Sequence, residues 1–191
     1  FMDLNSKKRT FLAALALLCS ASVLPAVTIT SFGNVTAPTW SDSSFTDFSS
    51  VSQGASSITF SGTDTNTLSG DVPLVDLSSL WGNDLQITGS ITTNPGTTFG
   101  VILFDQEFDQ ATFSGGSWSD LSGGSTLLSF VSAVGTFNSA EIIGIDIVGG
   151  GAGDALAATL TGASIVPEPS TYAALSGLLA LSWVMLRRRR A

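Results

Sequence analysis

The central part of this sequence contains no basic residue. All seven Lys and Arg residues lie near the two ends, at positions 7–9 and 187–190, so none occurs between Val27 and Val166. Of the fifteen Asp and Glu residues, all except Asp3 and Glu168 fall within that central segment. Such a surface repels nucleic-acid phosphates and offers no cationic side chain to displace their counterions. We therefore expect no nucleic-acid partner.

Histidine is absent, and the single cysteine, Cys19, lies in an N-terminal apolar run. A Ser-His-Asp or Cys-His catalytic site is therefore excluded, as are an internal disulfide and a zinc site of the usual N/S kind. The absence of Lys and Arg from the central segment also excludes Schiff-base chemistry and a charged phosphate clamp there.

Paired carboxylates are the catalytic option that this composition leaves open. A glycoside hydrolase needs two of them about 5–10 Å apart, and the central segment holds two glutamates, Glu107 and Glu141, with many aspartates. Because acids are so frequent, a close pair would arise by chance. We expect a non-catalytic protein, and a secreted carboxylate-dependent glycoside-active enzyme is the alternative.

Residues 1–26 have the form of a signal peptide. Lys7 to Arg9 provide a positive start, residues 11–18 form an apolar run, and small residues follow. We expect signal peptidase to cut after Ala26, although Ala21 or Ser22 would also serve. An uncleaved membrane anchor is the alternative, but the apolar run is short for a membrane span.

The C-terminal residues 166–191 combine a motif, an apolar stretch and a cationic end. The apolar stretch, Tyr172–Leu186, predicts a transmembrane helix, and the arginines after it predict a cytoplasmic stop-transfer block. Fifteen helical residues span about 23 Å against a hydrocarbon core of about 30 Å, which makes a poor permanent anchor. The motif is Val166, Pro167, Glu168 and Pro169, and the stop-transfer block is Arg187, Arg188, Arg189 and Arg190.

This order of Val-Pro-Glu-Pro motif, apolar helix and Arg cluster resembles the PEP-CTERM sorting tail of bacteria that make extracellular polysaccharide. The resemblance covers residues 166–191 only, and the same tail is also named after ice-binding proteins. It implies an exosortase partner, a transient stay in the inner membrane, and delivery to the cell surface or the exopolysaccharide matrix. A tail-anchored protein with a chance Pro-Glu-Pro is the alternative.

Residues 27–165 show short β-type runs separated by Gly, Ser, Asn and Asp, without a sustained helical period. Their number and spacing predict an all-β fold, a single antiparallel β-sandwich or jelly roll. We expect residues 149–154 to form the loop between the last two strands. The candidate strands are residues 27–32, 58–61, 85–92, 99–104, 111–113, 127–131, 142–148 and 156–165.

Three carboxylates and one tryptophan are the candidate binding residues of this domain. Asp105, Glu107 and Asp109 are candidate calcium ligands, because calcium prefers several oxygen ligands and these acids alternate directly after an apolar run. A solvated acidic hairpin is the alternative interpretation. Trp40, in a polar segment, is the candidate platform for stacking on sugar rings. Trp81 and Trp118 fit either that role or the core.

Ice binding is a third candidate function, and it would require a flat face of regularly spaced threonines. The sequence shows only local alternation, with no fixed repeat period. We therefore expect an exported, acidic, non-catalytic β-sandwich with a binding or structural role and exopolysaccharide as its candidate partner. The threonines in question are Thr28, Thr30, Thr63, Thr65 and Thr67.

Overall fold

The computed structural model describes residues 25–32, 41–42, 50–151 and 153–167, together with the single residues Leu178 and Ser182. Most of the predicted signal peptide and of the predicted sorting tail therefore lies outside the described residues. Within the described part of the chain, no helix is both long and apolar enough to cross a membrane.

Eleven antiparallel strands and two short 3-10 helices make up the described domain. Neighbouring strands follow the order β2-β5-β10-β7-β8-β9-β6-β11-β4-β3, and β1 pairs with β11. The strands are β1 (Val27–Thr30), β2 (Ser41–Asp42), β3 (Ser50–Gln53), β4 (Ile58–Thr63), β5 (Thr67–Val75), β6 (Asp84–Thr93), β7 (Thr98–Asp105), β8 (Gln110–Ser117), β9 (Ser125–Val134), β10 (Ile142–Gly149) and β11 (Ala155–Val166), and the helices are η1 (Ser78–Leu80) and η2 (Trp118–Gly123).

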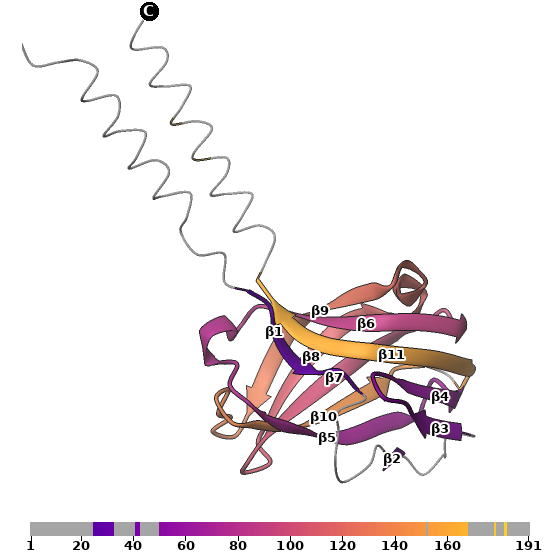
Figure 1. The fold of residues 1–191 in the computed structure, drawn as a ribbon, viewed down its shortest axis with the longest axis horizontal. Helices are drawn as coiled ribbons and strands as arrows, with labels where there is room; N and C mark the ends of the chain where they lie inside the picture. The colour runs from indigo at the N-terminus through magenta and orange to yellow at the C-terminus, as the bar shows by residue number, and fades with distance from the viewer. Residues whose placement is uncertain are drawn as a thin grey trace, which may run out of the picture.

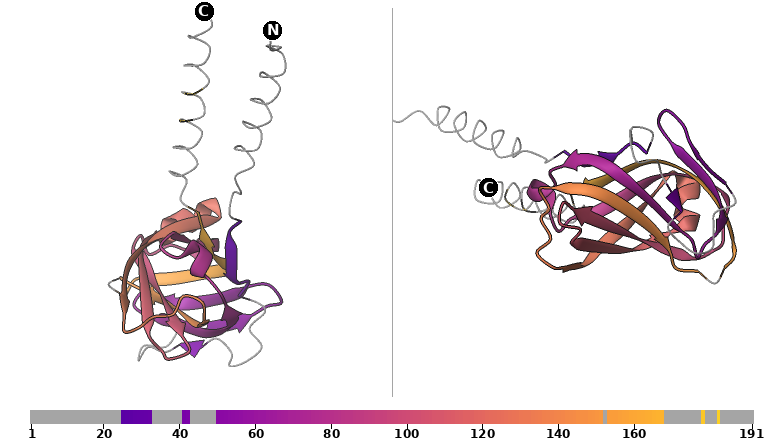
Figure 2. Two further views of the ribbon diagram at one scale, coloured as in Figure 1. Left: turned by 90° about the vertical axis from the view of Figure 1, so that its left-hand side faces the viewer. Right: turned by 90° about the horizontal axis from the view of Figure 1, so that it is seen from below.

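Strand β9 belongs to both layers of the fold. Its first half pairs with β6, from Ser125 to Leu128, and its second half pairs with β8, from Ser129 to Val134. The sheet therefore curls into two facing layers (Figures 1 and 2). We call β1, β3, β4, β6 and β11 sheet A, and β2, β5, β7, β8 and β10 sheet B. The predicted all-β antiparallel fold is confirmed, with a jelly-roll-like curl.

The core lies between the two sheets, because alternate residues of each strand face inward. In β7, Phe99, Val101 and Leu103 are buried while the residues between them are only partly covered. Burying one such side chain stabilises a fold by about 1.5–3 kcal/mol. Trp118 of η2 closes the core at one end, with its ring stacked on Phe99 at a centroid distance of 4.2 Å.

All eight predicted strands overlap strands of the structure, but the prediction missed the short strands β2 and β3 and the longer strand β5. Gly70, Asp71 and Pro73 indicate a turn in the sequence, yet these residues lie in a nine-residue strand. Proline is tolerated at a sheet edge, where no partner needs its missing N–H. Among the described residues, β2 pairs only with Leu68 and Ser69, which leaves that side of Pro73 without a neighbouring strand.

The chain enters and leaves the domain at one end. Strands β1 and β11 are antiparallel neighbours, and their register places Val27 opposite Ile165. Figure 1 shows the start of β1 and the end of β11 side by side, and the left view of Figure 2 agrees.

Candidate functional site

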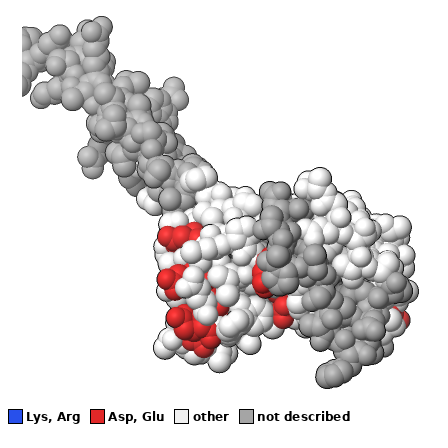
Figure 3. Space-filling model, turned by 60° about the horizontal axis from the view of Figure 1, so that its bottom comes forward, with Lys and Arg blue, Asp and Glu red and all other residues white. Residues whose placement is uncertain are grey.

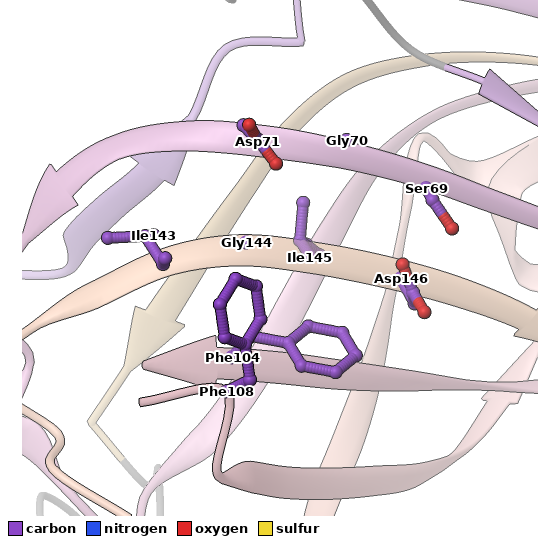
Figure 4. Close-up of a pocket in the computed structure, with 9 residues that line it drawn as sticks. All are labelled: Ser69, Gly70, Asp71, Phe104, Phe108, Ile143, Gly144, Ile145 and Asp146. Carbon is purple, nitrogen blue, oxygen red and sulfur yellow. The ribbon is translucent and has the colours of Figure 1, made fainter. Parts of the chain in front are cut away.

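A groove of about 180 Å³ lies on the outer face of sheet B, where β5, β10 and β7 run next to one another (Figure 4). We call it the β5–β10 groove. It combines aromatic, carboxylate and hydroxyl side chains. Its lining residues are Ser69, Gly70, Asp71, Phe104, Phe108, Ile143, Gly144, Ile145 and Asp146.

Gly144 forms the middle of the groove. The sheet register places it opposite Asp71 of β5 on one side and opposite Phe104 of β7 on the other. A Cβ atom at Gly144 would lie 3.4 Å from the Phe104 Cβ and 3.5 Å from its ring atom Cδ2. The phenyl ring therefore lies directly against the glycine, and the missing side chain keeps the centre of the groove open.

Asp71 and Asp146 place two carboxylates on the same face of neighbouring strands. Asp146 is opposite Ser69, two residues along from the pair of Gly144 and Asp71, so all of these side chains point outward. Asp71 is exposed, whereas Asp146 is half-buried. Burial raises the pKa of the Asp146 carboxyl, and a hydrogen bond with the Ser69 hydroxyl opposes that rise.

Phe108 lies in the hairpin turn between β7 and β8 and has a strained backbone. Its φ is +63°, in the left-handed region that glycine normally occupies at this position of a hairpin. Its side chain is nevertheless 72% exposed, so burial does not offset the strain. In Figure 4 the Phe108 ring lies beside the Phe104 ring, next to Gly144.

The side chain of Asp105 fixes this turn through hydrogen bonds with backbone N–H groups. Its Oδ1 atom accepts hydrogen bonds from the backbone N–H groups of Glu107 at 3.1 Å and Asp109 at 2.9 Å, while Oδ2 accepts one from Asn138 at 2.7 Å. The Asp105 side chain is fully buried. Because a buried carboxylate with three N–H donors is well satisfied, the turn is a rigid support for Phe108.

Two of the three candidate calcium ligands, Asp105 and Asp109, therefore have other partners. Asp109 accepts two hydrogen bonds, from the backbone N–H and the hydroxyl of Thr136, at 2.6 and 3.0 Å. Glu107 is exposed at the tip of the hairpin. In the described ranges, no three acidic side chains come close enough together to hold a metal ion. The geometry gives Asp105 and Asp109 a structural role in anchoring two loops.

A second buried aspartate, Asp64, organises the opposite end of the sandwich. Its Oδ1 atom accepts hydrogen bonds from the backbone N–H groups of Gly153 and Asp154, both at 2.9 Å, and Oδ2 accepts one from the Thr97 hydroxyl at 2.7 Å. Residues 150–154 connect β10 to β11, so the predicted loop is confirmed except for Gly149, which is the last residue of β10. A Cβ at Gly149 would lie 1.9 Å from the Asp64 carbonyl oxygen, so glycine is required there.

Trp118 is part of the core, and Trp81 is a partly buried residue that packs against it. Trp118 is 1% exposed, and Trp81 packs on the core beside Phe137 and Phe130 at centroid distances of 4.9 and 5.1 Å. Trp40, the predicted carbohydrate platform, lies outside the described residues.

The remaining predicted residues are scattered or lie outside the described part. Val166 is the last residue of β11 and pairs with Asp84, and Pro167 follows it, but Glu168, Pro169 and Arg187–Arg190 are not described. Thr30 is buried, while Thr63 and Thr65 share a hydrogen bond at the β4–β5 turn. These threonines therefore do not form a common flat face.

Sequence reasoning did not identify the groove residues Asp71, Phe104, Phe108 and Asp146. One signal was available: in the run Asp105–Asp109 between two apolar strands, a phenylalanine occupies the turn position where glycine or asparagine is usual. The other three residues carry no local signal, since they meet only through the pairing of β5, β10 and β7.

No protein-family model matches the chain, and no curated protein matches it in sequence. Among solved structures, an agarase, AgWH50C, superimposes with a TM-score of 0.52 at 10% identity, covering 76% of this chain and 25% of that one. The structure of PfGH50B superimposes with a TM-score of 0.50 at 10% identity, covering 71% and 23%. The family 30 carbohydrate-binding module of a cellulosomal cellulase of Clostridium thermocellum gives 0.48 at 11% identity, covering 76% and 99%.

The chain thus spans about a quarter of the length of the first two structures that it resembles. At such low identity the likeness concerns the fold alone. The chain is similar to them as an antiparallel β-sandwich.

Proposed function

We propose that this chain is an exported cell-surface or matrix protein whose β-sandwich binds polysaccharide, without catalysis, through the β5–β10 groove. The observation that carries the proposal is Phe108. A bulky residue in the left-handed region costs about 1–2 kcal/mol relative to glycine. Because the ring is mostly exposed, it does not recover that free energy by packing in the core. Strain of this kind is characteristic of a residue kept for binding.

The chemistry of the groove suits a sugar polymer. A pyranose ring presents C–H groups on its flat face, which pack on phenyl rings such as those of Phe104 and Phe108. Its hydroxyl groups can donate hydrogen bonds to the carboxylates of Asp71 and Asp146. Aromatic contacts beside a few polar groups are the usual composition of a ligand site.

The size of the groove favours binding of a polymer surface over enclosure of a small substrate. Pockets that enclose small ligands measure roughly 300–1,000 Å³, whereas this groove measures about 180 Å³. It would therefore contact one or two sugar rings of a longer chain. For the same reason we favour a binding module over the alternative, a carboxylate-dependent glycoside hydrolase.

A pair of substitutions at Phe108 tests the proposal. Phe108→Gly removes both the ring and the strain, so the protein should become more stable by about 1 kcal/mol while its retention by polysaccharide falls about tenfold. Phe108→Ala removes the ring but keeps the left-handed strain, so it should lose retention without that stabilisation. The measurements are urea unfolding and affinity electrophoresis of the full chain, in mild detergent, through gels containing soluble glucan, galactan or xylan.

Leu127→Ala is the matched control, because Leu127 is an exposed apolar residue of β9 that does not line the groove. It should leave retention unchanged. If Phe108→Gly migrates like the wild type in every polysaccharide that retards the wild type, the groove is not the binding site.

Export and sorting are the second part of the proposal. The adjacent positions of Val27 and Ile165 support it, since the N-terminal and C-terminal segments leave the domain at one end and could lead to the same membrane. We expect signal peptidase and exosortase to act on these segments. Comparing the mass and location of the mature protein in cells with and without exosortase tests this. Residues 172–186 persisting in the mature protein of normal cells would contradict it.

A further inference from the structure

The β5–β10 groove has a charge of one sign only. Asp71 and Asp146 contribute two carboxylates from adjacent strands, and the segment between Val27 and Val166 supplies no Lys or Arg to neutralise them. Figure 3 shows several acidic side chains at the left of the domain and others near the centre and right edge of the same face, and every charged residue drawn in colour there is acidic. A ligand in the groove therefore meets negative charge that no Lys or Arg side chain of the described residues offsets.

The two carboxylates differ in their surroundings, but both disfavour further negative charge. Asp71 is exposed, so its charge is well solvated until a ligand displaces the water. Asp146 is half-buried beside Ser69, where its ionised form is already less well solvated. An anionic group placed between them would be desolvated next to two like charges, which opposes binding strongly.

We propose that Asp71 and Asp146 determine the specificity of the groove, restricting it to uncharged polysaccharides and excluding polymers that carry carboxylate or sulfate groups. This inference rests on the proposed polysaccharide-binding function. The same carboxylates accept hydrogen bonds from the hydroxyl groups of a neutral sugar, so one pair of residues both attracts the neutral polymer and rejects the charged one.

Repulsion of an anionic polymer by direct contact with Asp71 and Asp146 can be distinguished from repulsion by the overall negative charge of the domain. Interactions between exposed charges are largely screened beyond about 10 Å at 0.1 M salt. Repulsion by the whole domain should therefore disappear in 0.5 M NaCl, whereas exclusion by carboxylates that touch the ligand should remain. A control variant that loses two negative charges outside the groove tests the same distinction without relying on salt.

The experiment compares neutral glucan, galactan and xylan with carboxymethylated derivatives of the same polymers. The full chain is studied in mild detergent, by affinity electrophoresis in 0.5 M NaCl. We expect the wild type to bind the neutral form of its polymer about tenfold more tightly than the carboxymethylated form. In Asp71→Asn/Asp146→Asn the ratio should fall below about threefold, because the amides remove both negative charges while keeping the size of the carboxylates and one acceptor oxygen at each position.

Asp120→Asn/Asp154→Asn is the matched control, since both aspartates are exposed and neither lines the groove. It should retain the wild-type ratio. Equal binding of both forms by the wild type would overturn the inference but leave polysaccharide binding intact, and so would an equal loss of discrimination in the control. Failure of the wild type to bind any of the six polymers would instead refute the proposed function. Near-ultraviolet circular dichroism shows whether each variant is folded.

Discussion

The outer faces of the two sheets differ in the kind of polar group that they carry, with paired hydroxyl groups on sheet A and carboxylates in the groove of sheet B. On sheet A, hydroxyl groups of adjacent strands form pairs: Thr59 with Thr159 at 2.9 Å, and Thr88 with Thr161 at 3.2 Å. At the edge of the sheet, Ser50 and Ser61 pair at 2.8 Å. Such pairs are a common way in which a solvated sheet surface stabilises itself.

The outer face of sheet B carries groups that raise the free energy of the folded state. Phe108 has a strained backbone and an exposed ring, and Asp146 is a half-buried carboxylate with no cationic partner among the described residues. Features that a fold does not need for stability are often retained for binding. The comparison therefore supports the proposal that binding occurs on the outer face of sheet B.

The largest expected effect on stability and on binding is that of replacing Asp105, which holds the turn that carries Phe108. Asp105→Ala leaves three backbone N–H groups without their buried acceptor, so it should lower the free energy of unfolding by about 3–4 kcal/mol. Retention by polysaccharide should fall as well, because the turn no longer holds Phe108. Urea unfolding and affinity electrophoresis below the melting temperature measure the two effects.

Asp64→Ala is the counterpart at the other end of the sandwich, where Asp64 also accepts three hydrogen bonds. It should cost a similar free energy of unfolding but leave retention intact. Equal loss of retention in both variants would mean that binding depends on stability alone and not on the position of Phe108.

A smaller difference in stability is expected between alanine substitutions at two glycines, one in each sheet. At Gly89 of sheet A a Cβ would lie 2.4 Å from the carbonyl oxygen of Thr159, so Gly89→Ala should destabilise the fold by about 2–3 kcal/mol. At Gly144 of sheet B the nearest atom, Phe104 Cβ, is at 3.4 Å. Gly144→Ala should change stability by less than about 0.5 kcal/mol yet weaken retention, because the methyl group occupies the groove.

Melting temperatures and polysaccharide retention of the two variants test this contrast. A Gly144→Ala protein that melts normally and binds normally would show that ligands do not approach the centre of the groove.

The smallest effect is a change in the pH dependence of stability. Because burial raises the pKa of Asp146 above its unfolded value, the native state binds this proton more tightly. The carboxylate therefore destabilises the fold above its native pKa, and this cost disappears as the pH falls through that pKa toward 3.8. Asp146→Asn should raise the melting temperature slightly at pH 7 and flatten its dependence on pH in that window.

At Asp76 the pKa shift, and therefore the pH dependence of stability, has the opposite sign. Hydrogen bonds from the hydroxyl and the backbone N–H of Ser78 lower the pKa of Asp76, so its ionised form favours folding. That contribution is present above its unfolded pKa and is lost as the pH falls through the lowered one. Asp76→Asn should therefore reduce stability at pH 7. A rise in melting temperature on its substitution would contradict the assignment.

The sequence by itself determined the fold class and the charge of the domain. Alternation such as that of Leu85, Gln86 and Ile87 requires one face of a strand to be buried, and turn residues at short intervals allow only short strands. The absence of Lys and Arg between Val27 and Val166 likewise makes any charged groove in this segment negative, whichever strands form it. Strand alternation is a local property and net charge is a sum over residues, so both can be predicted without knowing which strands are neighbours.

Only the tertiary structure decided where the groove lies and what forms it. Asp71 and Asp146 are 75 positions apart in the chain and become neighbours because β10 inserts between β5 and β7. The structure likewise showed that Asp105, a candidate calcium ligand in the sequence, binds three backbone N–H groups. Strand pairing and loop anchoring are long-range contacts, and the residues that form them carry no local pattern from which the partner could be inferred.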